Sequence, residues 1–420
     1  MTAEIVLLNP SAVAMAADSA ATVRVASGGS KIFSANKLFN LASGRPLGVM
    51  VYASSAFMGL PWETLIKEFR KSVGRDALGG VHDYATRLID FIQEVPEATT
   101  EKACANYMRV TVHDALKAVS KEVGDTLKPG PGVRKRMKKL REVLEQEIQR
   151  ISKEPRSTWM KRIDERSMPV DAVVDELLPG VFPKVCFYKK DVRALYRLAR
   201  LHCSRVSPHG WSSGLVVAGF GDDAMYPELT SFAVEGMPAK GALVARHEQH
   251  LVIGPDRRAA IVPFAQSDMV YTFTMGVDPV LDDIYQRMLI LYQATILERV
   301  RPTCSTSEFA DLEVAIEAIR SDFAKASQEA KLQNHVWPIL DMLAHLPKDE
   351  IAQLAEALVA LTSLKRRISR TEETVGGPTD VAVVSKGDGF VWVKRKHYFQ
   401  PEMNLQFVAN KLNNGLGGLS

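Results

Sequence analysis

Thr2 is the residue whose position offers chemistry most directly. It follows the initiator Met1, and its small side chain favours removal of that methionine. The new terminus would carry a hydroxyl and a free α-amine on one residue, and an α-amine, with a pKa of about 7.7–8.0, accepts a proton near neutral pH. A threonine activated by its own amine is one way in which hydrolases make a nucleophile from a weak hydroxyl. Thr is common in second position, so the residues that follow must support this interpretation.

Short strands must position the groups near Thr2. Apolar runs at residues 3–9 and 12–17 predict two strands joined by a turn at residues 9–11. Asp18 follows the second strand directly, and Lys31 begins another extended run. The sequence therefore offers a carboxylate and an ammonium group close to the ends of strands that start beside Thr2.

The rest of the chain divides into strands and long helical stretches. Further strands are predicted at 37–41, 47–53, 213–220, 227–234, 241–246, 381–384 and 390–394. Helices are predicted from near residue 56, at 81–95, 99–123, 134–151, 170–178 and 189–203, and within 280–366. Asp278 is predicted to cap the helix that begins at Pro279.

The order of these elements resembles the proteasome β-subunit family, including its bacterial HslV-type relatives, which are N-terminal-nucleophile (Ntn) hydrolases. Aligning residues 16–18 with the family's Ala-Ala-Asp places Thr2 on the catalytic threonine without a gap. Lys31 then falls on the catalytic lysine, after a loop slightly shorter than usual. Gly376 and Gly377 match the family's Gly-Gly turn before its closing hairpin. The resemblance covers a little over half of the chain, concentrated at its two ends.

This resemblance implies an α+β fold, a four-layer αββα sandwich with large helical insertions. The sandwich would comprise residues 2–73 and 206–400, with an enlarged helical region at 280–366, and residues 74–205 would form a helical insertion. Subunits of this family usually form rings, and the additional amphipathic helices must bury their apolar sides. We therefore expect a homo-oligomer, although nothing in the sequence identifies an unfoldase partner.

The resemblance also assigns roles to single residues. Thr2 would be the nucleophile, Lys31 would stabilise its alkoxide, and Asp18 would orient Lys31. The backbone N–H of Ala53 would occupy the oxyanion position, and Glu372 falls where the family has a catalytic Asp. These assignments predict a peptide or amide substrate attacked through an acyl-enzyme, with no cofactor and no metal.

Two further residues complete the expected site. Thr22 and Val51 occupy positions that the resemblance assigns to substrate binding. Lys31→Ala should abolish turnover, whereas Lys37, outside the expected site, should tolerate replacement.

The chain departs from the family pattern near the nucleophile. Ala53 replaces the usual Gly and fits only if its φ angle is negative. Glu372 adds a methylene to the usual Asp, Val375 removes a hydroxyl, and the Ser expected beside Gly276 is missing. Two alternatives therefore stay open: a catalytically inactive scaffold or assembly protein, and a hydrolase of small amides rather than peptides.

Composition excludes several other classes. The net charge of +4 over 420 residues gives little reason to expect nucleic acid. No apolar run approaches the roughly 20 residues that span a bilayer. The first residues lack a basic region followed by an apolar one, so we do not expect a signal peptide. The four cysteines are scattered, which is typical of a reducing cytoplasm. We expect a cytoplasmic protein without membrane partners.

Two further clusters invite a functional interpretation. The basic run at 134–139 is predicted to be a solvated helix face, with an anionic docking surface as the alternative. His247 and His250 lie on a predicted strand, where a step of three residues points side chains to opposite faces. This spacing argues against a shared metal.

Overall fold

The computed structural model describes residues 3–24, 30–74, 77–126, 133–160, 168–183, 187–206, 212–368 and 376–397, with short pieces between and beyond these ranges. The side chains of residues 22–24, 30–32, 125, 126 and 133 lie outside this description.

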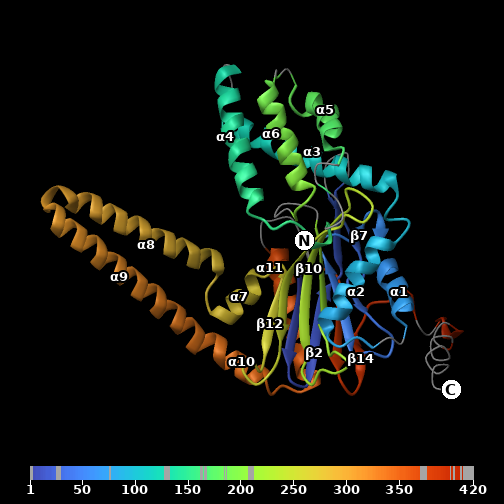
Figure 1. Ribbon diagram of the computed structural model, residues 1–420. Coiled ribbons are helices and arrows are strands. Elements are labelled where there is room, and N and C mark those ends of the chain that lie inside the picture. The colour runs from blue at the N-terminus through green and yellow to red at the C-terminus, as the bar shows by residue number, and fades with distance from the viewer. Residues whose placement is uncertain are drawn as a thin grey trace.

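Two five-stranded antiparallel sheets lie at the centre of the molecule (Figure 1). The strands of the first sheet are β1 (Ala3–Asn9), β2 (Ala12–Asp18), β12 (Ala260–Ala265), β13 (Thr379–Ser385) and β14 (Gly389–Lys394). The strands of the second are β5 (Leu38–Asn40), β6 (Leu47–Tyr52), β9 (Ser213–Gly219), β10 (Glu228–Gly236) and β11 (Val244–Val252). The strand orders are β12-β1-β2-β13-β14 and β11-β10-β9-β6-β5. The fold is thus mixed α/β with antiparallel sheets.

Strands β1 and β2 are buried on both faces. Val6, Leu8 and Met15 belong to the apolar layer between the two sheets. Ile5 and Leu7 belong to a second layer on the opposite face of the first sheet. Double burial explains why the predicted runs at 3–9 and 12–17 are continuously apolar rather than alternating. Both strands are confirmed.

Helices cover the outer faces of the two sheets. Helix α11 (Lys348–Ile368) packs on the first sheet through residues that include Ile351 and Leu358. Helices α1 (Trp62–Val73) and α2 (Val81–Glu94) pack on the second sheet. Helix α1 begins six residues later than predicted, because residues 56–61 form the small hairpin β7 (Ala56–Phe57)–β8 (Leu60–Pro61).

Four helices between α2 and β9 enclose a core of their own. They are α3 (Glu101–Thr126), α4 (Val133–Ser152), α5 (Val170–Val181) and α6 (Lys189–His202). The Arg141 guanidinium on α4 donates two hydrogen bonds, at 2.8 and 3.1 Å, to the buried carboxylate of Asp191 on α6. In the basic run, Met137 faces the helical core while residues 134–136 and 138 are exposed. The basic side chains thus lie on the solvent side of the helix, as predicted, and this exposure fits a docking surface equally.

The helical region between β12 and β13 contains a long hairpin. It comprises α7 (Asp268–Met275), α8 (Pro279–Val300), α9 (Thr306–Lys331) and α10 (Trp337–Leu343), followed by α11. Asp278 caps α8, because its Oδ1 accepts hydrogen bonds from the N–H groups of Val280 and Leu281 at 2.9 and 3.3 Å. Helices α8 and α9 lie side by side and extend away from the sheets (Figure 1).

Among the described helices, none combines the length and apolar composition that crossing a bilayer requires.

Candidate functional site

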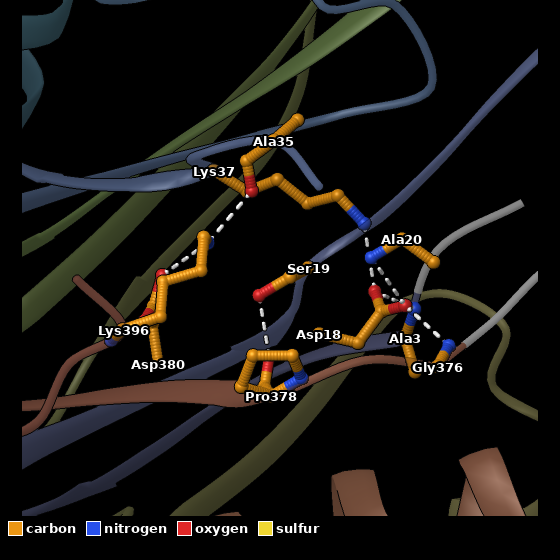
Figure 2. A network of polar contacts seen from close by, with 10 residues as sticks. All are labelled: Ala3, Asp18, Ser19, Ala20, Ala35, Lys37, Gly376, Pro378, Asp380 and Lys396. Carbon is orange, nitrogen blue, oxygen red and sulfur yellow. Dashed lines mark hydrogen bonds and ion pairs between the residues drawn. The ribbon is translucent and has the colours of Figure 1, made fainter. Parts of the chain in front are cut away.

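Asp18, at the end of β2, is the centre of a buried polar network (Figure 2). The residue is 1% exposed. Its Oδ1 accepts hydrogen bonds from Lys37 Nζ at 2.7 Å and from the backbone N–H of Ala3 at 3.0 Å. Its Oδ2 accepts from the backbone N–H groups of Gly376 and Ala20 at 2.9 and 3.3 Å. One carboxylate therefore joins segments from both ends of the chain.

The structure places the side chain of Lys37 on Asp18, and this side chain is buried rather than at the surface. It is 6% exposed and forms a buried ion pair with Asp18. The expectation that Lys37 tolerates replacement is wrong, because removing its ammonium group would leave a buried carboxylate without its counter-charge. The backbone N–H of Val51 donates to the Lys37 carbonyl at 2.9 Å and fixes the start of β5.

A second buried ion pair holds the segment that presents Lys37. Lys396 Nζ donates to Asp380 Oδ2 at 2.7 Å and to the Ala35 carbonyl at 2.8 Å (Figure 2). The Ala35 N–H in turn donates to the Ser19 carbonyl at 2.8 Å. The loop before β5 is thereby fastened to both β2 and β13.

The structure does not describe Thr2, Glu372 or Val375, yet the chain ties them to residues of the network. Thr2 is bonded to Ala3, and adjacent Cα atoms lie about 3.8 Å apart. Glu372 precedes Gly376 by four residues, which span at most roughly 14 Å when extended. The described neighbours of these residues, Ala3 and Gly376, both donate a backbone hydrogen bond to the Asp18 carboxylate.

Lys31 and Thr22 form part of a small separate sheet. Strands β3 (Ala20–Arg24) and β4 (Ser30–Ser34) pair with each other, with Val23 opposite Lys31 and Thr22 opposite Ile32. The side chains of Lys31 and Thr22 lie outside the described part of the structure.

Strand β6 brings Val51 next to Lys37, and Ala53 follows the end of this strand. The Val51 side chain is 4% exposed and packs in the apolar layer beneath α1 and α2, so its contact with Lys37 is made by its backbone. Ala53, directly after β6, has φ = +68°. From the sequence, an alanine at this position is expected to require a negative φ, and the structure does not meet that condition. An L-residue pays roughly 1–2 kcal/mol in this conformation, which glycine adopts freely.

Glu4 is a buried carboxyl group close to the same network. By the alternation of β1 it faces the second sheet, and it is 2% exposed. Neither of its side-chain oxygens has a hydrogen-bond partner among the described residues. Burial raises the pKa of Glu4 well above its usual value; the charge of Lys37 opposes this shift and that of Asp18 adds to it.

Tyr52 occupies the space on the second sheet that faces Glu4. Burial raises the pKa of Tyr52 to about 12, with smaller contributions from Glu248 and Glu4. Its ring lies across Gly214 on the paired strand β9, where a Cβ would come within 1.9 Å of the ring. Glycine at that position is what allows the aromatic ring to fill this end of the layer between the sheets.

The histidines of β11 differ from the sequence expectation. A bulge between Ser231 and Phe232 in the pairing with β11 breaks the period of two. His247 and His250 consequently both contact the His82 ring of α2, with centroids 5.1 and 5.4 Å away. Burial and the two neighbouring histidines lower the pKa of His247. Within the described residues, no group of three His, Cys, Asp or Glu side chains is placed to hold a metal ion.

The sequence does not predict two buried groups near Asp18. The family resemblance points to Lys31, the first lysine after Asp18, rather than to Lys37. A lysine directly before the apolar run Leu38-Phe39, at the start of a strand, was the available signal. The buried Glu4 carries no sequence signal beyond a single acidic residue inside an apolar strand.

No family model matches the chain, and no curated protein does. Two solved structures that are similar to it are Anbu proteins. Anbu (ancestral beta-subunit) from Yersinia bercovieri has 11% sequence identity and a TM-score of 0.28, covering 99% of this chain and 95% of the other. An Anbu (Gly-1) mutant from Hyphomicrobium sp. strain MC1 has 11% identity and a TM-score of 0.27, covering 100% and 96%. The resemblance stated from the sequence is therefore wrong in the family that it names, because the structures found are those of a distinct family.

Proposed function

We propose that the chain is a threonine-type Ntn hydrolase that cleaves peptide or amide bonds through an acyl-enzyme on Thr2, exposed by removal of Met1. The observation that carries this proposal is the Asp18 carboxylate, whose Oδ1 holds both Lys37 Nζ and the N–H of Ala3. Because Ala3 is bonded to Thr2, this shared contact supports a role for the buried ammonium group of Lys37 at the nucleophile that we propose.

The architecture supports the same proposal. With α11 on the first sheet and α1 and α2 on the second, we propose a four-layer αββα sandwich. Helix α2 falls inside the expected insertion at 74–205, yet it packs on the sheet, so we assign the insertion to α3–α6.

Each group has a defined part in the proposed reaction. The Thr2 hydroxyl attacks the carbonyl carbon, and its proton passes to the Thr2 amine, directly or through a water. Lys37 stabilises the developing alkoxide, and the N–H of Ala53 donates to the oxyanion. Collapse of the tetrahedral intermediate breaks the C–N bond, and the leaving amine takes the proton from the terminal ammonium group. Water then hydrolyses the ester on Thr2.

The nucleophile is tested by mass spectrometry of the full chain. Intact mass should show that Met1 is absent. An epoxyketone or β-lactone should add one inhibitor mass to the N-terminal peptide of the wild type and none to that of Thr2→Ala. Equal labelling of the two proteins, or retained Met1, excludes Thr2 as the nucleophile.

The lysine is tested by a pair of substitutions. Lys37→Arg keeps the buried charge but displaces it, and a displacement of about 1 Å lowers turnover on the order of 100-fold. Lys31→Met should leave turnover within a few-fold. If Lys31→Met lowers turnover and Lys37→Arg does not, Lys31 stabilises the alkoxide as the sequence predicts, and Lys37 is a structural residue.

A turnover assay with two kinds of substrate distinguishes a peptidase from a hydrolase of small amides. Fluorogenic peptides and small amides of the same leaving group are compared by kcat/KM, and hydrolysis of small amides alone favours the amidohydrolase alternative.

The second candidate is a catalytically inactive assembly protein. The exposed hairpin α8–α9 favours it, because apolar helices that extend from a domain need a partner to cover them. We propose a homo-oligomer in either case. Failure of Thr2 to label, with the assembly intact, would select this second function.

A further inference from the structure

The hairpin of α8 and α9 exposes an unusual amount of apolar surface. Every residue of these two helices, all of which the structure describes, is at least partly exposed. The exposed apolar side chains include Leu281, Ile284, Met288, Leu291, Ile319 and Phe323. A helix that is apolar on all sides is normally buried in a protein interior or in a bundle. The two helices cannot cover each other completely, so their outer faces need another partner.

The spacing of the exposed side chains is that of a helix bundle. Leu281, Ile284, Met288 and Leu291 follow one another at steps of three, four and three residues. On α9, Ile319 and Phe323 are followed by alanines at steps of three and four. Heptad spacing of this kind packs side chains of one helix into the spaces between side chains of another. Helices α8 and α9 also contact each other, and Leu289 of α8 is partly buried.

Both helices contribute to one apolar groove. Tyr285, Met288 and Tyr292 of α8 and Phe323 of α9 line a groove of about 320 Å³. Met288 of the exposed side chains on α8 and Phe323 of those on α9 therefore share one face of the hairpin, and a helix laid along this groove would contact both helices.

One ion pair joins the two helices at the base of the hairpin, and another fixes that base to the body. Lys331 Nζ of α9 donates to both carboxylate oxygens of Asp282 of α8 at 2.7 Å. Lys365 of α11 lies 3.3 Å from Oδ2 of Asp278, the residue that caps α8. From there the helices extend away from the sheets (Figure 1). A partner can therefore approach the outer part of the hairpin without meeting the sheets.

We propose that this face binds the same face of a second copy of the chain, so that two hairpins form an antiparallel four-helix bundle. The area of the hairpin face agrees with a second copy as the partner. The 22 residues of α8 make a helix roughly 33 Å long. Two helices, each about 10 Å wide, then offer roughly 660 Å² per copy, close to the ~800 Å² of a standard interface.

The charge distribution of α9 favours the antiparallel arrangement. Residues 306–318 contain four acidic residues and no basic one, whereas residues 319–331 contain three basic and two acidic residues. The halves carry net charges of −4 and +1. Antiparallel packing sets the acidic half of one copy against the basic half of the other, and parallel packing would set acid against acid. This inference is independent of the chemistry at Thr2.

The first test is the mass of the full-length protein by light scattering at micromolar concentration. The wild type should elute at a multiple of the 46.4 kDa of one chain. Met288→Glu should halve the mass of the assembly, and circular dichroism should show unchanged helix content, since Met288 is 48% exposed. The matched control is Met225→Glu, which changes an exposed methionine outside the hairpin and should leave the mass unchanged. A monomeric wild type, or equal masses for all three proteins, overturns the proposal.

The second test fixes the orientation of the copies. Ile319 lies at the middle of α9, where an antiparallel pair brings the two copies of a residue together. Ile319→Cys should therefore form a disulfide-linked dimer under mild oxidation, and the wild type should not. A disulfide-linked wild-type dimer through Cys304, at the tip of the hairpin, would instead join the two tips and overturn the antiparallel arrangement.

Discussion

The ends of β1, β2 and β5 bury charged groups, whereas the α8–α9 hairpin exposes apolar ones. At Asp18, four donors from distant segments satisfy a carboxylate that water hardly reaches. On the hairpin, side chains such as Leu291 and Tyr292 are largely in solvent. Burial of charge is unfavourable unless partners are held in place, and exposure of apolar surface is unfavourable unless a partner covers it. The Asp18 carboxylate thus finds its partners within one chain, whereas the apolar side chains of the hairpin are not covered by the part of the chain that the structure describes.

The two regions draw their stability from different contacts. The network around Asp18 depends on contacts made across the whole sequence, from Ala3 to Gly376. The hairpin depends on contacts between neighbouring helices and on assembly. Substitutions in the first region should therefore lower the stability of the single chain, and substitutions in the second should mainly change association.

The largest effect is expected at Lys37. Lys37→Met removes one partner of a buried ion pair and leaves the Asp18 carboxylate uncompensated, which typically lowers the free energy of unfolding by about 3–5 kcal/mol. Urea denaturation measures this loss. Lys71→Met is the control, since Lys71 is exposed and its ion pair with Glu68 lies at the surface. A similar, small change for both variants would remove Lys37 from the buried network.

A matched pair of leucines compares the two regions directly. Leu8 lies between the sheets, and Leu8→Ala should lower the free energy of unfolding by about 2–5 kcal/mol through lost contacts and a cavity. Leu291→Ala on the hairpin should change it by less than about 0.5 kcal/mol when measured below the concentration of assembly. Equal losses would show that the hairpin is part of the core of the single chain.

Glu4 should make stability depend on pH. Its pKa is raised in the folded protein, so its contribution is fully present below the unfolded value, near 4.5, and is lost as pH rises towards the folded value. Within that window the ratio of folded to unfolded chains should fall about tenfold per pH unit for this group alone. Comparison of Glu4→Gln with the wild type from pH 5 upwards isolates the effect. Parallel pH profiles would place Glu4 in contact with water.

A small gain in stability is expected at Ala53, where the φ of +68° strains the backbone. Ala53→Gly should raise the free energy of unfolding by about 1 kcal/mol, because glycine adopts this angle without steric cost. Thermal denaturation measures the gain. A loss of stability would mean that the methyl group of Ala53 makes contacts worth more than the strain.

Local patterns in the sequence predict most of the strands and helices. Continuous apolar runs indicate β1 and β2, a polar cap followed by proline indicates the start of α8, and helical periodicity of apolar residues indicates the helical regions. These signals are local, since each depends on residues a few positions apart. Asp18, in contrast, is identified by its match to the Ala-Ala-Asp of the family that the sequence resembles.

Only the tertiary structure decided which groups meet. The sequence favoured Lys31 because it could not fix the length of the loop after Asp18, and the structure brought Lys37 to the carboxylate. A bulge put His247 and His250 on one face, against the period of a regular strand. The positive φ of Ala53 and the isolation of Glu4 likewise arise from packing between distant strands. Pairing across hundreds of residues leaves no local pattern, because it is selected by the packing of the whole fold rather than by the preferences of single segments.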